Sequence, residues 1–240
     1  HVCEPRRLAP AAAAFVEACV AAGLPRNRDW NDGTAIDGAG PMQLNINGGR
    51  RSSTAKEYLR PAMKRGNLHV ETGVLASRIV VENGRAVAVE ARRNGQPVTF
   101  RAAREIVCSS GAIETPKLLM LSGIGDGAAL QALGIPVIHH SPGVGRNLQD
   151  HLIAKFIYRT KPCGTLNEIL QSPFRKAKMG LDYLLSRTGP LSIGAGEANA
   201  FARVTPGAEE AEIQFLFVNF STFNYQAGLH DFPGFMFNYG

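Results

Sequence analysis

The amino-acid sequence predicts a mixed α/β (α+β) fold for this chain of 240 residues. Three observations indicate it: helical spacing of apolar residues in 9–22, two Asn-Gly pairs between strand-like segments in 70–102, and a short apolar segment at 105–108 before a turn of small residues. Hydrophobic residues make up 45% and charged residues 19%, which is typical of a globular chain. The length suffices for one or two domains with a core.

The first third of the chain contains two predicted helices and a loop between them. Residues 9–22 form a helix with an apolar face, and a glycine and a proline that follow it are typical of a helix end. Residues 29–49 are rich in glycine and asparagine, which predicts a loop with positive φ angles. A second helix begins at Ser53 or Thr54 and ends at Lys64.

An antiparallel meander follows the second helix. The segment Val70–Glu82 is strand-like and ends at Asn83-Gly84, which is a strong signal for a two-residue hairpin. A second strand, Arg85–Arg93, ends at Asn94-Gly95, and the third strand runs from Val98 to Ala102. Three strands joined by two tight turns form a sheet without crossover connections.

The segment Glu105–Cys108 is a short apolar run without alternation, as expected of a strand covered on both faces. Small residues follow it, and Thr115 as a cap with Pro116 at the first position predicts a helix over Lys117–Leu121. Further elements are expected along the rest of the chain: a helix at 128–133, a strand at 136–139, a tight loop at 142–145, a helix at 175–187 and strands at 198–203, 213–220 and 235–240.

The net charge of +6 comes from the first 110 residues. Lys56, Arg60 and Lys64 would form one stripe on a helix, which fits either a contact with phosphate or a solvated helix face. No aromatic residues alternate with these cations, so a platform for stacking nucleic-acid bases is not indicated. We favour the solvated face and expect no nucleic-acid partner.

The four cysteines, Cys3, Cys19, Cys108 and Cys163, contain no CxxC pair, and the histidines have no metal-ligand spacing. We therefore expect no metal site, and we expect buried, reduced thiols in a cytoplasmic protein. No apolar run is long enough for a transmembrane segment. Peripheral association with a membrane is compatible with this expectation.

The turn Ser109–Ala112 lies between a predicted buried strand and a predicted helix. Small side chains let a ligand approach the backbone, and the free N–H groups of a helix start favour phosphate or ribose oxygens. A nucleotide site is one interpretation of this turn. An ordinary turn of an α/β fold is the other.

The longer string that contains this turn is more specific. Gly111–Gly125 reads GAIETPKLLMLSGIG and resembles the second signature of the glucose–methanol–choline (GMC) oxidoreductase family. Four further segments are similar to those of the family's choline-dehydrogenase-like branch: Asn47–Ser52, Tyr58–Pro61, Asn67–Thr72 and Gly143–His151. The resemblance covers essentially the whole chain and is firmest over 40–155.

The resemblance implies a flavoprotein that uses FAD to oxidise the CH–OH group of a small alcohol. In the family a histidine removes the hydroxyl proton and a hydride passes to the flavin. The implied fold is part of an FAD-binding domain with an inserted antiparallel β-meander, plus part of an antiparallel-sheet substrate domain. We expect a helix and loop segment in 1–45, the central part of the FAD-binding domain in 46–155 and the start of the substrate-binding domain in 156–240. The particular alcohol, the electron acceptor and the oligomeric state stay open.

The resemblance also implies cofactor-binding and substrate-binding residues. Ala76 lies where the family's strand backbone meets the adenine, and Ser109, Ser110 and Gly111 lie where the chain passes the ribose. Glu197 corresponds to an acid that faces the cationic head group in choline-oxidising relatives, although a structural or rim role is the alternative. For His151 a structural hydrogen bond is expected rather than the role of catalytic base.

Two features of the family are not found in the sequence. It has no GxGxxG motif, and the resemblance places the catalytic histidine downstream of Gly240, so we assign no catalytic residue. We interpret the chain as a central fragment that binds FAD poorly and is inactive by itself. Two alternatives stay open: a hydroxynitrile lyase that keeps FAD without redox use, and a non-catalytic basic binding module.

Overall fold

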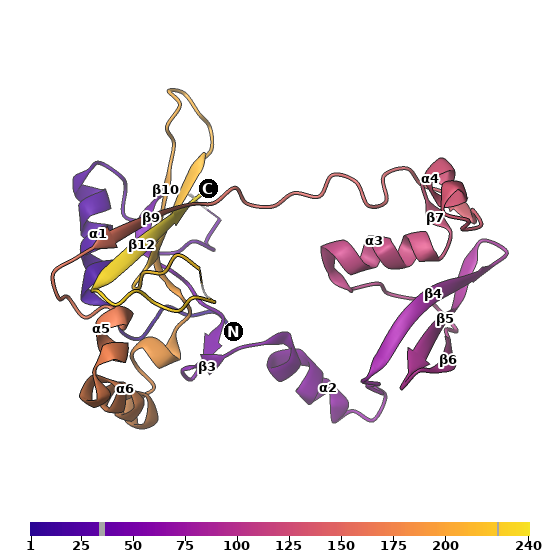
Figure 1. Cartoon of the computed structure of the whole chain (residues 1–240), viewed down its shortest axis with the longest axis horizontal. Helices are drawn as coiled ribbons and strands as arrows, with labels where there is room; N and C mark the ends of the chain where they lie inside the picture. The colour runs from indigo at the N-terminus through magenta and orange to yellow at the C-terminus, as the bar shows by residue number, and fades with distance from the viewer. Residues whose placement is uncertain (34–36, 225) are drawn as a thin grey trace. The chain divides into compact units, whose positions relative to one another are not determined.

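The computed structural model describes residues 1–33, 37–224 and 226–240. The chain forms two compact units (Figure 1): residues 1–65 with 151–240, which we call the sheet unit, and residues 66–150, which we call the meander unit. The roles that the resemblance gives to 1–45, 46–155 and 156–240 stay predictions.

The sheet unit contains most of the secondary structure. Its helical segments are α1 (Pro10–Ala21), η1 (Ala55–Leu59), α2 (Arg60–Met63), α5 (Leu166–Gln171), α6 (Pro173–Ser186) and η2 (Pro190–Ser192). Its strands are β1 (Gly38–Pro41), β2 (Ile46–Asn47), β3 (Arg50–Arg51), β9 (Ala154–Arg159), β10 (Gly196–Ala202), β11 (Ile213–Val218) and β12 (Gly234–Tyr239).

A five-stranded antiparallel sheet forms the centre of this unit, in the order β1-β10-β11-β12-β9. Helix α1 packs on the sheet, where Ala12 and Val16 contact a buried cluster that includes Ala198, Ala200 and Phe217. The small alanines of β10 allow the helix to approach the sheet closely, and burial of the aromatic and aliphatic side chains stabilises the contact.

Most of the predicted elements of this unit are confirmed. The helices expected at 9–22, at 53–64 and at 175–187 correspond to α1, to η1 with α2 and to α6. The strands expected at 198–203, 213–220 and 235–240 correspond to β10, β11 and β12. The elements that were not predicted include α5 and β9, whose sequences show little periodicity, and the short elements β2, β3 and η2.

The prediction of an uninterrupted loop over 29–49 is wrong, because β1 lies within it and forms an edge of the sheet. Glycine is required there by close packing. A Cβ atom at Gly40 would lie 2.1 Å from the carbonyl oxygen of Asn27, and one at Gly38 would lie 2.5 Å from that of Pro25. Gly38 and Gly40 are of a residue type that is typical of loops, but here they are part of a strand.

The meander unit consists of a three-stranded sheet and short elements beside it. Strands β4 (Val74–Glu82), β5 (Arg85–Arg93) and β6 (Gln96–Arg101) pair in sequence order, which confirms the predicted meander. Asn83 and Asn94 have φ angles of 51° and 50° in the two turns, as Asn-Gly hairpins require. The other elements are α3 (Gly111–Leu121), β7 (Ile124–Gly125), α4 (Gly127–Ala132) and β8 (His139–His140).

A buried hydroxyl joins α3 to the meander. Ser122, which follows α3, accepts a hydrogen bond from the Ile79 amide at 2.8 Å and donates one to the Leu118 carbonyl at 2.6 Å. Ile79 and Leu118 are buried beside it. This hydroxyl thus satisfies an amide of β4 and holds α3 against the sheet.

Three predictions for this unit need correction. The strand at Glu105–Cys108 does not form, and Val107 is 75% exposed, because no strand of the described residues pairs with this segment. Helix α3 begins at Gly111, so Thr115 lies inside it rather than capping its start, and the Thr115 hydroxyl accepts a hydrogen bond from the Ser110 amide at 3.0 Å. The strand expected at 136–139 is reduced to β8, which pairs in parallel with β7.

The thiols agree only in part with the expectation from the sequence. The four cysteines are free, as expected, but they are half-buried rather than buried. Among the described residues, no helix has the length and hydrophobicity needed to cross a membrane. The described part of the chain also contains no cluster of three or more metal-ligating side chains.

Candidate functional site

The turn Ser109–Gly111 lies exposed at the start of α3 in the meander unit. Gly111 has a φ of 91°, a backbone conformation that favours glycine, and a Cβ atom there would meet no atom within 4 Å. The requirement for glycine is therefore conformational. The amides of the first turn of α3 have no partner within the helix, which makes this turn suitable for an anionic group.

A pocket of about 520 Å³ lies in the same unit, beside α3 and the segment 145–149. Two cations line it. Lys117 pairs with Glu114 at 3.0 Å, and Arg146 pairs with Asp126 at 3.5 Å; both cations and Glu114 are exposed, whereas Asp126 is half-buried. The two cations and the free amides at the start of α3 are groups that can contact the phosphates of a ligand, although each cation also has an acid beside it.

Ala76 lies on β4 in the meander unit, opposite Ala91 on β5, and its surface is exposed. The strand register shifts between Ala76 and Arg78, so a β-bulge follows Ala76. Helix α3 packs against β4, but no hydrogen bond among the described residues joins Ala76 to Ser109–Gly111. The structure thus brings these four residues into one unit without a direct bond between them.

Glu197 lies in the sheet unit, inside β10 rather than before it. The register of β10 against β11 shifts between Gly196 and Ala198, so Glu197 occupies a β-bulge, which redirects its side chain. The side chain is 3% exposed, and Oε2 accepts a hydrogen bond from the Ala9 amide at 2.8 Å. Since Ala9 precedes α1, the carboxylate supplies the acceptor that the start of this helix otherwise lacks.

Burial raises the pKa of Glu197 above its ordinary value of 4.5. Hydrogen bonds from the Ala9 amide and from the Asn219 side chain act in the opposite direction but offset only part of the effect. None of the ion pairs among the described residues includes Glu197. The carboxylate is therefore buried with hydrogen bonds but without a cation.

Two pockets, of about 280 and 260 Å³, share Glu197 in their linings. Both also include Asn219, Pro190 and Ile193, so they adjoin each other between η2 and the sheet. The shared lining is apolar apart from the carboxylate and the amide. Such a lining can hold a small organic ligand oriented by few polar contacts.

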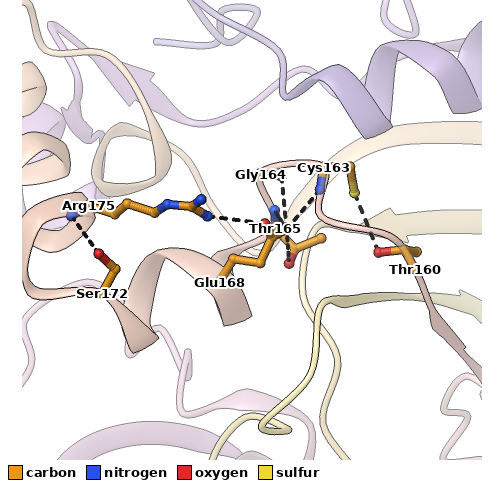
Figure 2. A network of polar contacts seen from close by, with 7 residues as sticks. All are labelled: Thr160, Cys163, Gly164, Thr165, Glu168, Ser172 and Arg175. Carbon is orange, nitrogen blue, oxygen red and sulfur yellow. Dashed lines mark hydrogen bonds and ion pairs between the residues drawn. The ribbon is translucent and has the colours of Figure 1, made fainter.

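A second buried acid, Glu168, is the centre of a network of polar contacts beside the larger of these pockets. Figure 2 shows this network. Oε2 of Glu168 accepts hydrogen bonds from the amides of Cys163, Gly164 and Thr165 at 3.1, 2.9 and 2.8 Å and from the Thr165 hydroxyl at 3.0 Å. Oε1 contacts Arg175 of α6 at 3.1 Å. Because Gly164 and Arg175 line the pocket, this acid positions the turn and α6 around it.

Glu168 and Asn219 were not predicted from the sequence. The pattern Thr165-x-x-Glu168 is a capping box, which is a recognisable signal for the start of α5. Asn219 gives only a weak signal, a polar residue after an apolar strand. His151 is exposed, and the structural hydrogen bond expected for it stays a prediction.

Residues 1–153 match the family model described as GMC oxidoreductase. This match includes the whole meander unit and the signature at the start of α3. The chain belongs to the GMC oxidoreductase family. It is 44% identical over 212 residues to human "Choline dehydrogenase, mitochondrial", covering 87% of this chain and 35% of that protein. It is also 44% identical over 208 residues to "Oxygen-dependent choline dehydrogenase" of Rhizobium johnstonii, covering 85% of this chain and 37% of that protein.

Solved structures agree with a GMC fold. Pyridoxine 4-oxidase from "Mesorbium loti" is 27% identical with a TM-score of 0.80, and the match covers 100% of this chain and 43% of that chain. A formate oxidase variant of Aspergillus oryzae RIB40 has a TM-score of 0.85 at 23% identity, which shows the fold alone, and covers 99% of this chain and 46% of that chain. The chain thus spans about a third of the length of these curated GMC relatives and under half of the length of the chains in these solved structures.

Proposed function

We propose that this chain is one part of an FAD-dependent GMC oxidoreductase. The complete enzyme oxidises the CH–OH group of a small alcohol. The match of residues 1–153 to the family carries this proposal. In it, the meander unit supplies part of the FAD-binding surface. The sheet unit supplies part of the substrate-binding surface.

The residues of the meander unit suit FAD. A diphosphate needs cations and free backbone amides, and Lys117, Arg146 and the start of α3 offer both. The open space beside Gly111 lets a ribose approach the backbone of Ser109–Gly111, and Ala76 offers exposed backbone for adenine. Bound FAD would supply a hydride acceptor. The residues of this chain would bind and orient it.

On the substrate side we propose Glu197 as the residue that faces the ligand. Its place in both pockets supports this role, while its bond to Ala9 supports the structural alternative. The two roles are compatible because Ala9 uses only one carboxylate oxygen. The histidine base expected downstream of Gly240, the cytoplasmic location and the hydroxynitrile lyase alternative stay predictions.

Titration of the 240-residue chain with FAD, followed by flavin fluorescence, tests the cofactor surface. We expect weak, saturable binding, no stoichiometric flavin in the purified chain and no turnover. Replacing both Lys117 and Arg146 by alanine should weaken binding about tenfold, because each charged contact with a phosphate contributes about 0.5–1 kcal/mol at an exposed site.

Lys161→Ala with Lys176→Ala removes two exposed cations of the sheet unit and serves as the matched control. This pair should leave FAD affinity unchanged. Equal affinity of the Lys117/Arg146 double variant and the unaltered chain would exclude the pocket beside α3 as the phosphate site. Stoichiometric flavin in the purified chain would show that weak binding is the wrong expectation.

A further inference from the structure

Helix α6 turns an apolar side away from the sheet unit. Phe174, Leu181 and Leu185 lie along one line of the helix, because residues seven and four positions apart share a face, and Leu184 lies beside them. These side chains are between 54% and 79% exposed, and we call them the apolar stripe. Figure 1 shows α6 at the lower end of the sheet unit, below α5.

The opposite side of α6 faces the unit and carries polar groups. Met179 and Asp182 line the larger pocket beside η2, and together with Tyr183 they are half-buried. A surface helix of a globular protein normally directs its apolar face to the core. Packing within this unit therefore does not account for the apolar stripe, and a continuous exposed patch of this kind marks an interaction site.

Cations accompany the apolar stripe along its length. Lys176 and Lys178 lie on its two sides near the start of the helix. At the other end, Arg6 donates a hydrogen bond to the Ser186 carbonyl at 3.1 Å. The sequence of α6 contains three cations and one acid, Asp182, which pairs with Lys178. The polar groups around the stripe thus carry an excess of positive charge.

An anionic lipid surface is complementary to this arrangement. A helix with phenylalanine and leucine on one side and cations beside them lies in the plane of a membrane interface, with its apolar side chains at the boundary of the acyl chains. The long stems of lysine allow the ammonium groups to reach lipid phosphates. A second copy of α6 would instead present the same excess of cations, so its charge is not complementary.

We propose that the apolar stripe of α6 is a docking surface for membranes that contain anionic lipids. The stripe would lie at the boundary of the acyl chains, and Lys176 and Lys178 would contact lipid phosphates. The proposal assigns to one helix the peripheral membrane association with which the sequence is compatible. It goes beyond the proposed function and does not depend on it, since docking requires neither FAD nor an alcohol.

Flotation of the complete protein encoded by the gene with phospholipid vesicles tests the proposal. Vesicles of phosphatidylcholine alone are compared with vesicles in which about one third of the lipid is phosphatidylserine. We expect binding to the anionic vesicles to be at least about tenfold tighter and to weaken as salt is added, because lysines contact their surface. Absence of binding to the anionic vesicles overturns the proposal, and so does equal binding to both kinds.

Two double variants separate the apolar and the charged contacts. Leu181→Gln with Leu185→Gln keeps good helix formers and should weaken vesicle binding about tenfold or more, since burial of one leucine contributes about that factor. Lys176→Gln with Lys178→Gln should weaken binding to the anionic vesicles about tenfold and leave binding to phosphatidylcholine unchanged. Unaltered vesicle binding by the leucine variant would exclude the stripe as the docking surface.

Leu133→Gln with Leu152→Gln is the matched control, because both leucines are highly exposed and lie outside α6. It should bind vesicles as the unaltered protein does. Thermal unfolding and analytical ultracentrifugation of the Leu181/Leu185 variant identify other occupants of the stripe. A loss of stability without a loss of vesicle binding would show that the rest of the protein covers the stripe. Dissociation of an oligomer would show that a second copy does, and either result overturns the proposal.

The outcome is separate from the test of the proposed function. Vesicle binding is measured without substrate, whereas flavin content and turnover are read from the visible spectrum. A protein that binds flavin but no vesicles would overturn the docking surface alone. A protein that binds vesicles but no flavin would overturn the proposed function alone.

Discussion

Replacing Glu168 by alanine is expected to lower the free energy of unfolding of the sheet unit by about 3 kcal/mol. One oxygen of this acid accepts four hydrogen bonds, three of them from consecutive backbone amides, Cys163 to Thr165. The side chain is 7% exposed, so water would replace these bonds poorly. Alanine also removes the partner of Arg175 and the capping box of α5.

The effect of Glu168→Ala should depend on pH in a defined direction. Burial by itself would raise the pKa of Glu168, but the hydrogen bonds from Thr165, Cys163 and Arg175 together lower it below its ordinary value of 4.5. The stabilisation is therefore fully present above pH 4.5 and is lost as the pH falls through the lowered pKa. Urea unfolding of both proteins at neutral pH and at about pH 3.5 should show the difference shrinking in acid.

Glu210→Ala removes an exposed acid in the loop after β10 and is the control, with an expected change within about 0.5 kcal/mol. A loss below about 1 kcal/mol for Glu168→Ala would mean that water or other donors replace the network. A difference that grows as the pH falls would contradict the direction given for the pKa.

Gly40→Ala is expected to destabilise the sheet unit by at least about 3 kcal/mol. The added Cβ would lie 2.1 Å from the backbone oxygen of Asn27 and cannot be relieved by rotating a side chain. The distance is fixed because the Asn27 amide donates to Ala39 and the Ala39 amide donates to Pro25, both at 2.9 Å. We expect β1 to separate from the segment that precedes it, measurable as a lower thermal midpoint.

Gly180→Ala is the matched substitution in the same unit. Gly180 lies within α6, its φ is not positive, and a Cβ atom added there would have no atom within 4 Å. Alanine should therefore raise stability by about 0.5–1 kcal/mol, because glycine is the poorer helix former. Similar effects of the two substitutions would show that close packing at Gly40 is not the reason for its glycine.

The parts of the fold that depend on neighbours in sequence could be predicted. The meander follows from Asn83-Gly84 and Asn94-Gly95, since the positive φ angles of such pairs determine the turn. Helices α1 and α6 follow from local apolar spacing and from the residues that end them. These signals require no knowledge of the rest of the chain.

The parts that depend on distant partners could not be predicted. Strand β1 has the composition of a loop and exists because it pairs with β10 and because the segment before it packs against its glycines. The apolar segment Glu105–Cys108 has the composition of a strand but finds no pairing strand among the described residues. Composition describes what a segment tolerates, whereas a strand also needs a neighbour for its hydrogen bonds.

The candidate site shows the same division. The resemblance indicated Ser109–Gly111 and Glu197 as residues of interest, but it gave no information on their surroundings. The bulge that redirects Glu197 and the hydrogen bond from Asn219 to it arise from the pairing of β10 with β11. Neither residue type nor spacing contains that information.

The visible absorbance spectrum of the complete protein encoded by the gene, recorded anaerobically before and after addition of a primary alcohol, tests the central claim most directly. Membership of the GMC family predicts a flavin spectrum with stoichiometric FAD and bleaching of that spectrum as the alcohol is oxidised. Flavin that is present but not bleached by any primary alcohol would favour the lyase alternative. Absence of bound flavin from the complete protein would contradict the account.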